Sequence, residues 1–436
     1  LPSIAPPSGT KPSDFVQPIP FSSNVMTVAD PDLRMPKTNM WSLSIQRQVM
    51  KDTVLEIAYL GRRGVGLFGG YDVNQAEFVK NGFLDAFNIV KAGGESSLIN
   101  QLAGPDSRRR TGESGSQMVR RLYASTLNLN SVAALAKDLG SRIQGGRNLP
   151  DLAGLGATFI IPFPQYSGAL RVIDSNDYST FHSMQLKLER RFASGLSYLA
   201  SYSWSKSLDT RSYDPAFTTV STGNAQSASS TPFDLYNRRL NYARSDFDRT
   251  HVLQLTWTYE LPFGAGKWLA SSAGSALNRI IGGWQVAGFM TVQTGRPMTA
   301  YSGANTVSNV VQTPANCNGC SKDMGQVFDD PSQGLIFYFN ADERAKFSTP
   351  AAGQFSNVGR NYFTGPGGFG MDLGILKRTY IRENHYLEFR AEFTNLTNTP
   401  TFGFPTLTAT STIFGRIRDT VVSGSRKMQL GLKYNF

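Results

Sequence analysis

The feature that most constrains the fold of this chain is a strict alternation of apolar and polar residues. In the last eleven residues, Met428, Leu430, Leu432, Tyr434 and Phe436 alternate with polar residues or glycine. Successive side chains of a β-strand point to opposite faces, so this pattern predicts a strand with one apolar and one polar face. The same alternation recurs along the chain and predicts nine strands in all.

Eight of these strands are predicted to form antiparallel pairs. The pairs are residues 41–45 with 55–59, 184–188 with 196–204, 253–261 with 283–295, and 371–375 with 387–393. The connections within pairs are short or medium, whereas those between pairs are long. Long loops are predicted over about residues 61–177, 208–247, 297–369 and 397–423, and some of them contain residues at helical spacing.

Two observations favour a membrane barrel over a soluble β-sandwich. The polar faces carry charged residues in the middle of long strands, which is typical of a barrel with a wet lumen. Trp41, Tyr59, Trp204, Tyr259 and Trp284 lie near strand ends, as expected for aromatic residues at a membrane interface. The residues predicted to face the lumen are Lys187, Glu189, Gln254, Glu388, Arg390 and Glu392.

Composition favours strands and turns over long soluble helices, so that any membrane contact would be made through strands. Charged residues make up only 17% of the 436 residues, while Gly (42), Phe (28) and Tyr (17) are abundant. The net charge of +11 is spread along the chain rather than gathered in one strip, which argues against a nucleic-acid partner. The basic groups around Arg108 and Arg120 are predicted to form a solvated or lipopolysaccharide-facing surface.

The chain has two cysteines, Cys317 and Cys320, separated by two residues. A zinc site would need two further ligands, and the three histidines lie on separate predicted strands. A local disulfide in an oxidising compartment is therefore the favoured interpretation, ahead of a redox-active pair.

No catalytic motif is found in the sequence, and the chain is not expected to be an enzyme or to bind a cofactor or metal. Glu388 and Glu392 have the period-2 spacing of a strand face, which favours lumen lining over acid/base catalysis. Asp246 and Asp248 are expected to order a loop that enters a strand, with calcium binding as the weaker alternative.

Several segments together resemble a known family, the TonB-dependent outer-membrane receptors, and within it the Oar-like group. They include YSTFHSMQLKLERRFASGL at 178–196, SDFDRTHVLQ at 245–254, GGWQVAGFMTVQTGRP at 282–297 and FRAEFTNLTNTPTFG at 389–403. Each motif is weak alone, but the ordered set covers roughly residues 36–436. The resemblance is to the C-terminal part of the receptor barrel.

The resemblance implies an all-β fold: a portion of an antiparallel transmembrane β-barrel of about 22 strands. The nine strands of residues 38–436 would be the last ones, and residues 1–37 would be the tail of a preceding extracellular loop. A nine-strand sheet has two open edges, so the chain is expected to be a fragment of a larger barrel. The plug and the segment that contacts the TonB system would lie in an N-terminal region outside this sequence.

The expected function is TonB-dependent transport of an unknown bulky extracellular substrate across the cell outer membrane. The expected surroundings are outer-membrane lipid and lipopolysaccharide. Tyr434 and Phe436 resemble the C-terminal signal that the barrel assembly machinery recognises. One alternative is a passive barrel that acts as a surface adhesin or binding scaffold, and another is a soluble β-sandwich binding module.

Overall fold

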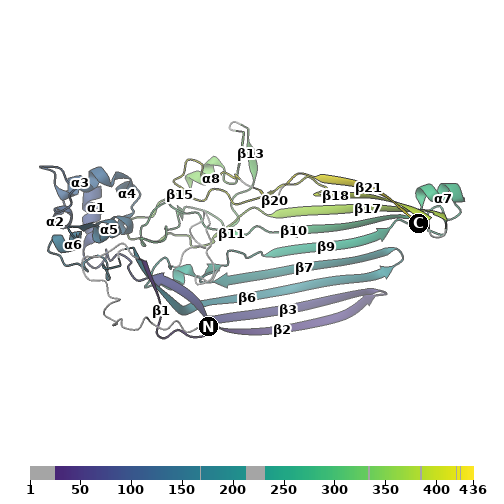
Figure 1. Cartoon of the computed structure of the whole chain (residues 1–436), viewed down its shortest axis with the longest axis horizontal. Coiled ribbons are helices and arrows are strands. Elements are labelled where there is room, and N and C mark those ends of the chain that lie inside the picture. Colours follow the sequence, from purple (N-terminus) through teal and green to yellow (C-terminus); the bar gives the residue numbers. More distant parts are fainter. Residues whose placement is uncertain are drawn as a thin grey trace.

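The computed structural model describes residues 25–166, 168–212, 231–331, 334–382, 385–418, 420–422 and 424–436. Its main feature is one large sheet of long strands, with nine along its path in the order β2-β3-β6-β7-β9-β10-β17-β18-β21 (Figure 1). The neighbours on this path are antiparallel. The strands are β2 (Lys37–Met50), β3 (Thr53–Asp72), β6 (Ala169–Ala193), β7 (Leu196–Asp209), β9 (His251–Glu260), β10 (Trp284–Gln293), β17 (Gly368–Arg382), β18 (His385–Thr394) and β21 (Lys427–Asn435).

The nine predicted strands and their four pairs are confirmed, and the short turns explain the pairing. Between β6 and β7, Ser194 and Gly195 both have positive φ, 52° and 80°, as a tight hairpin turn requires. Asp52, between β2 and β3, also has a positive φ of 63°. Consecutive strands therefore pair directly, and β2 and β21 form the two edges of the sheet in the described part of the chain.

The register sorts side chains into two faces. Residues directly opposite each other share a face, so the pairing can be followed from strand to strand. One row across β3, β6, β7, β9, β10 and β17 is apolar: Leu55, Leu188, Ala200, Leu255, Met290 and Met371. The adjacent row on the opposite face is Glu56, Lys187, Ser201, Gln254, Thr291 and Gly370.

Two glycines on the apolar face make room for tryptophans. Trp41 lies opposite Gly61, and Trp257 lies opposite Gly288. A Cβ on Gly61 would lie 2.1 Å from the Trp41 ring, and one on Gly288 would lie 2.2 Å from the Trp257 ring. Each indole therefore lies over a glycine of the neighbouring strand, which is an arrangement that stabilises register.

Lys377 is a charged exception on the apolar face, opposite Trp284. Its ammonium group lies 5.2 Å from the centroid of the Trp284 ring and donates a hydrogen bond to the Gly282 carbonyl oxygen. The side chain thus reaches the turn between β9 and β10, where helix α7 (Ser275–Ile281) also lies. A lysine near the end of a membrane strand can place its charge at the interface in this way.

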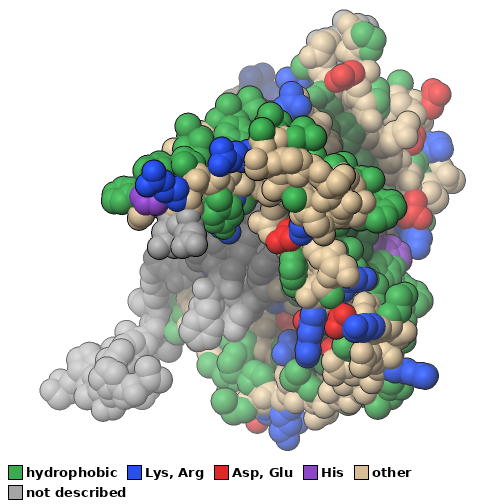
Figure 2. All heavy atoms as spheres, turned by 90° about the vertical axis from the view of Figure 1, so that its right-hand side faces the viewer, with side chains coloured by type: hydrophobic (Ala, Val, Ile, Leu, Met, Phe, Trp, Pro, Cys, Tyr) green, Lys and Arg blue, Asp and Glu red, His purple; other side chains and the backbone are tan. Residues whose placement is uncertain are grey.

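The two ends of the sheet differ. Figure 1 shows the short turns, α7 and the C-terminus at one end, here called the turn end, and the long connections at the other, the loop end. Figure 2 views the turn end and shows hydrophobic side chains along the rim of the sheet, with Lys and Arg side chains between them.

The connection between β3 and β6 forms a helical unit at the loop end, defined here as residues 73–166 (Figure 1). Its helices are α1 (Phe83–Lys91), α2 (Ser97–Ala103), α3 (Gly115–Leu122), α4 (Ala124–Asn128), α5 (Val132–Ser141) and α6 (Leu149–Leu152), with the short strands β4 (Ile143–Gln144) and β5 (Arg147–Asn148). Phe83, Phe87, Ile99, Leu135 and Leu139 are fully or almost fully buried in its core. The unit therefore has a hydrophobic core of its own.

A second folded cluster at the loop end comes from the connections after β10 and β18. Its apolar core includes Met298, Phe339, Phe363 and Phe414. The elements of these connections are β11 (Pro297–Met298), β12 (Asn316–Cys317), β13 (Phe328–Asp330), β14 (Leu335–Phe337), α8 (Ala341–Ala345), β15 (Phe347–Ser348), β16 (Phe363–Thr364), β19 (Thr401–Phe402) and β20 (Thr420–Val422).

The structure shifts some predicted boundaries. β3 runs to Asp72 and β6 starts at Ala169, so the longest loop is shorter than the predicted 61–177 because these two strands continue past the alternating segments. In the predicted N-terminal tail, residues 1–24 lie outside the described residues, and β1 (Val25–Ala29) pairs in parallel with β6. Between β7 and β9 lie η2 (Arg238–Asn241) and β8 (Ala243–Arg244), which pairs with β7.

The assignment of faces can be tested in the middle of a central strand. Leu255→Arg would place a charge on the apolar face of β9, where lipid contact makes it cost about 2 to 4 kcal/mol at the bilayer midplane. The neighbouring change Gln254→Arg places the same charge on the polar face and should change the free energy of unfolding little. Urea unfolding of the full-length protein from lipid vesicles measures both, and equal losses in the two variants would contradict the assignment.

Candidate functional site

The polar face of the sheet collects all six residues predicted to face the lumen. Lys187 lies opposite Ser201, which lies opposite Gln254, which lies opposite Thr291. Thr291 and Ala287 share a face, and Ala287 lies opposite Gly374, which lies opposite Glu392. Glu189, Arg390 and Glu388 follow at steps of two along their strands. The register therefore places these residues on one face, although some apolar side chains such as Phe289 share it.

Charges on the polar face are paired along and across strands. Lys187 and Glu189 form an ion pair of 2.9 Å, with both side chains about half exposed. Glu388 is almost fully buried and accepts from Arg378 at 2.8 Å and from Arg390 at 2.6 Å. The buried carboxylate thus lies between two guanidinium groups, which keeps a charged network in the middle of the strand β17–β18 pair.

At the loop end, Arg360 is the centre of a buried ionic network. Its guanidinium donates to Asp209 Oδ1 at 2.8 Å, to Asp246 Oδ1 at 3.1 Å and to Ser212 Oγ at 2.7 Å, and its side chain is 3% exposed. Burial lowers the pKa of Arg360, but the two carboxylates raise it more, so that its pKa is raised overall. The network attaches the connection after β10 to the end of β7 and to the segment before β9.

Neighbouring ion pairs extend this network across the end of β6. Arg211 donates to Asp177 at 2.7 Å, and Arg238 donates to Asp174 at 2.5 Å. Asp174, Asp177 and Asp209 are all buried. Breaking a buried pair leaves a charge without its partner and typically costs about 3 to 5 kcal/mol, so these contacts hold the loop end in one arrangement.

A cavity of about 370 Å³ lies at the loop end of β9, β10 and β17. Its lining combines two arginines with backbone and aromatic groups: Arg249, Arg296, Gly368, Gly370, Phe402 and Phe404 are among its residues. Arg249 donates to the Thr294 carbonyl oxygen at 2.6 Å, and the Arg296 guanidinium lies 4.8 Å from the centroid of the Phe404 ring. Burial lowers the pKa of Arg249, and the charge of Arg296 lowers it further.

A larger cavity of about 630 Å³ lies where β6 and β7 approach the loop end. Its apolar lining includes Met184, Trp204 and Tyr59, and its cationic lining includes Lys206, Arg244 and Lys322. Burial lowers the pKa of Arg244, whose guanidinium donates to the carbonyl oxygens of residues 361–363. Tyr59 Oη lies 2.7 Å from His182 Nδ1 at the edge of this cavity.

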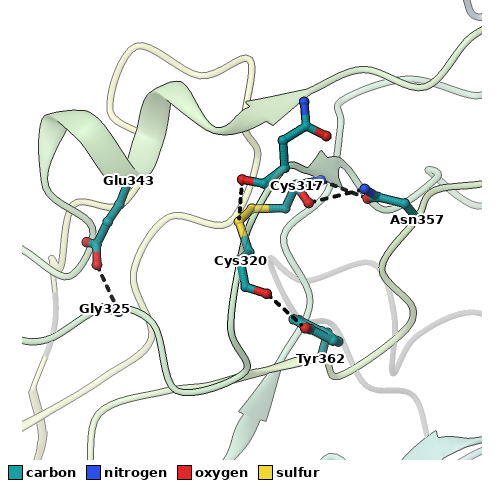
Figure 3. Close-up of a disulfide and its surroundings, with 7 residues drawn as sticks. Cys317, Cys320, Gly325, Glu343, Asn357 and Tyr362 are labelled. Atoms are coloured by element: carbon teal, nitrogen blue, oxygen red, sulfur yellow. Dashed lines mark hydrogen bonds between the residues drawn. A yellow bond between two sulfur atoms is a disulfide. The ribbon is translucent and has the colours of Figure 1, made fainter.

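Cys317 and Cys320 form a disulfide in the second folded cluster (Figure 3). The backbone around it is held by Asn357, which accepts from the Cys317 N–H at 2.9 Å and donates to its carbonyl oxygen at 3.1 Å. Tyr362 donates to the Cys320 carbonyl oxygen at 3.0 Å. Tyr362 is two residues after Arg360 in the sequence. Its hydrogen bond therefore links the disulfide to the segment that carries the centre of the buried ionic network.

The terminal strand ends in an aromatic pair at the turn end. Tyr434 Oη lies 2.8 Å from His385 Nδ1, and the Tyr434 and Phe436 rings are stacked with centroids 6.0 Å apart. Phe436 is 90% exposed. The two residues predicted to form the assembly signal therefore present adjacent rings.

Metal-ligand geometry is not found in the described part of the chain, where no three His, Cys, Asp or Glu side chains are grouped suitably for a metal ion. Asp246 accepts from Arg360 and from the Asn361 side-chain amide, and Asp248 accepts the Ser207 backbone N–H. Asp246 and Asp248, for which calcium binding was the weaker alternative, therefore both have structural hydrogen bonds. None of the described helices is long and apolar enough to cross a membrane.

The sequence family follows from a match over nearly the whole chain. The model of the family described as "Outer membrane beta barrel domain" matches residues 2–429. The chain belongs to this outer membrane β-barrel family. Its large antiparallel sheet, with one apolar face, is the transmembrane wall of the barrel domain, and the protein is located in the outer membrane.

Solved structures similar to this barrel domain share little sequence with it. The outer membrane transporter YddB from Escherichia coli matches with 9% identity and a TM-score of 0.38, over 95% of this chain and 35% of its own. BauA, the ferric preacinetobactin receptor from Acinetobacter baumannii, matches with 8% identity and a TM-score of 0.34, over 92% of this chain and 29% of its own. A Pseudomonas aeruginosa FadL homologue matches with 9% identity and a TM-score of 0.18, over 92% of this chain and 67% of its own.

The barrel domain thus spans about a third of the length of the first two of these proteins. No curated protein sequence matches it.

Sequence reasoning missed the Arg360 network and the arginines of the smaller cavity. Arg249 and Arg296 lie 47 positions apart in the sequence and meet only because β9 and β10 are paired. Asp209 is the last residue of β7, whereas Asp246 and Arg360 come from two separate connections. A useful signal was nevertheless available for the smaller cavity, since Arg249 and Arg296 each lie within a few residues of a predicted strand end.

The buried Asp248 predicts a pH dependence of stability. Burial raises its pKa in the folded protein above that of an unfolded aspartate, about 3.9. As pH rises, the unfolded chain loses its proton first, so Asp248 lowers the free energy of unfolding once pH exceeds that value, and most at neutral pH. Asp248→Asn keeps an oxygen acceptor for the Ser207 N–H and should therefore be more stable than the wild type at neutral pH.

This stability gain should shrink as the pH falls towards 4, where the wild-type carboxyl is also protonated. Urea unfolding of the full-length protein in lipid vesicles across this pH range measures the difference. Asp32→Asn, at an exposed position, is the matched control and should leave the pH profile unchanged. A gain for Asp248→Asn that is the same at every pH would refute the prediction.

Proposed function

We propose that the chain forms part of the wall of a TonB-dependent transporter that moves a bulky substrate through a wide, polar lumen. The observation that carries the proposal is the charged polar face of the nine-stranded sheet, with Glu388 between Arg378 and Arg390 in mid-strand. Such charges are stable in a membrane wall when they face water inside a barrel. The sequence motifs that resemble the Oar-like group of TonB-dependent receptors support the same function.

The two open edges of the sheet support a barrel with more strands than those of the described residues. β2 and β21 remain two separate edges in the described residues, and an open edge is not tolerated in lipid. We propose that further strands close the barrel, that the loop end is extracellular, and that the turn end is periplasmic. Barrels of about 22 strands have a lumen large enough to need a plug, and we assign the plug and the TonB contact to other parts of the transporter.

The proposal gives this chain a transport role without catalysis or a bound cofactor. Lys187, Glu189, Gln254, Glu388, Arg390 and Glu392 would line the lumen, and lipopolysaccharide would surround the extracellular rim. The loop-end cavities and the helical unit would form the surface that the substrate meets first.

A second candidate function is a passive barrel that serves as an adhesin or binding scaffold. The helical unit favours it, because a folded loop with its own core offers a rigid extracellular surface. This function would need no energy coupling and no passage through the lumen.

Gene deletion distinguishes the two functions. Strains that lack either this gene or tonB should fail to grow on the same compound, tested across a panel of ferric siderophores, oligosaccharides and peptides as sole iron or carbon source. Restoring the gene on a plasmid should restore growth only where tonB is present. Normal growth of both deletion strains on every compound, together with reduced attachment to surfaces, would favour the adhesin.

The proposed assembly signal predicts a defect in folding rather than in stability. Deletion of Phe436 from the full-length protein should reduce the amount of barrel in the outer membrane, because we propose that the assembly machinery recognises the aromatic residues at the end of β21. Removal of the similarly exposed Trp268 side chain by Trp268→Ala, in the connection before α7, is the control. Heat-modifiable migration on gels measures folded barrel, and an unchanged yield after deletion of Phe436 would contradict the role.

A further inference from the structure

The smaller loop-end cavity is lined by two arginines and by no acidic residue. It measures about 370 Å³, and its lining includes Arg249, Arg296, the three glycines Gly367, Gly368 and Gly370, and Thr401 and Phe402 from the connection after β18. No carboxylate is among its lining residues. The two arginines therefore bring positive charge to one small space without a matching acid.

The cavity lies on the polar side of the sheet. Thr291 and Gln293 of its lining share a face with Gln254, since Thr291 lies directly opposite Gln254. Gly370 lies opposite Thr291, and Gly368 lies opposite Gln293. The cavity is thus continuous with the face that is proposed to line the lumen, at its loop end.

Neither arginine is neutralised by a carboxylate in the described part of the chain. No ion pair of Arg249 or Arg296 is found there, and the charges of the two arginines repel one another. Asp372 lies one step further along the same face of β17, but it is not part of the lining and it accepts the Asn395 backbone N–H at 2.8 Å. A guanidinium pair in a partly buried space is stabilised when an anion binds between its members.

The other lining residues of the cavity indicate what kind of group a bound anion would carry. A Cβ placed on Gly370 would meet no atom within 4 Å, so the glycine leaves open space above β17. Phe402 and Phe404 supply aromatic surface beside the arginines. The cavity therefore offers guanidinium groups for an anion and flat apolar surface for the group that carries it.

We propose that this cavity binds an acidic group, a carboxylate, sulfate or phosphate, that is attached to an aromatic or apolar part of the substrate. The idea that the bound molecule is then transported rests on the proposed function, whereas the binding itself does not. Arg249 and Arg296 recognise the anion, and the glycines of β17 let the adjoining group approach the backbone.

Binding of phenyl phosphate to the purified full-length protein tests the site without energy coupling. Calorimetric titration at 0.15 M salt, about the physiological level, should detect phenyl phosphate and no binding of phenol, its uncharged counterpart. Arg249→Gln and Arg296→Gln should each weaken the affinity about tenfold, the effect of losing one charge-assisted contact. Arg110→Gln, an exposed arginine of the helical unit with the same change of charge, should bind like the wild type.

A second variant fills the cavity and keeps both charges. Gly370→Ile suits a strand and directs its side chain into the open space, so it should abolish binding while heat-modifiable migration remains normal. Arg296→Lys keeps the charge but loses the fork geometry, and it should bind more tightly than Arg296→Gln and less tightly than the wild type.

The outcomes separate this proposal from the transport proposal. Equal binding of phenol and phenyl phosphate, absence of phenyl phosphate binding to the wild type, or unchanged binding by the folded Gly370→Ile variant would each overturn the anion site. If the site binds as expected but growth never depends on tonB, the site stands and the transport function is the part that fails.

Discussion

Hydrogen bonding between neighbouring strands is the constraint on which the rest of the structure depends. A chain in lipid must pair its backbone groups internally, and this one does so by antiparallel pairing of consecutive strands. Once the pairing register is set, the face of every side chain is set too, because a slip by one residue would exchange the two faces. The apolar row through Leu255 and the polar row through Gln254 both follow from that single register.

The same register explains how the loop end is organised. β6 and β7 bring Asp177 and Asp209 to the loop end, and Arg249 lies just before β9. The connections then supply Arg211 and Arg360 as partners of the two carboxylates and Arg296 beside Arg249. The carboxylates of the β6 and β7 ends have guanidinium partners, whereas the arginines near β9 and β10 do not form ion pairs with described residues. At the loop end, the charges near β6 and β7 are therefore paired, whereas the two arginines near β9 and β10 are positioned to bind an anion.

The strands could be predicted from the sequence because alternation is a local signal. Met184, Leu186 and Leu188 indicate their strand within five residues, and the turn at Ser194 and Gly195 indicates its partner. The shared face of Lys187, Gln254 and Glu392 was also predictable, since each lies on the polar side of an alternating segment. The continuation of β3 to Asp72 was not, because its glycine-rich end carries little alternation.

The contacts between connections could not be predicted, because they join residues that are distant in sequence and lie outside any periodic segment. Arg360 meets Asp209 across 151 positions, and Arg244 meets the carbonyl of Tyr362 across 118. The helical unit was predicted only as short helices. Ser114 and Gln117 form a capping box at the start of α3, which was a local signal for a further helix.

The attachment of the helical unit makes it an interchangeable module. It leaves the sheet after Asp72 and returns at Ala169, and Asp72 lies opposite Arg171 on the neighbouring strand, so its two ends are held side by side. In topology the unit is the loop of a hairpin, and the entropy of closing such a loop rises only with the logarithm of its length. Such an insertion can grow, shrink or be replaced during evolution without moving a single residue pair of the wall.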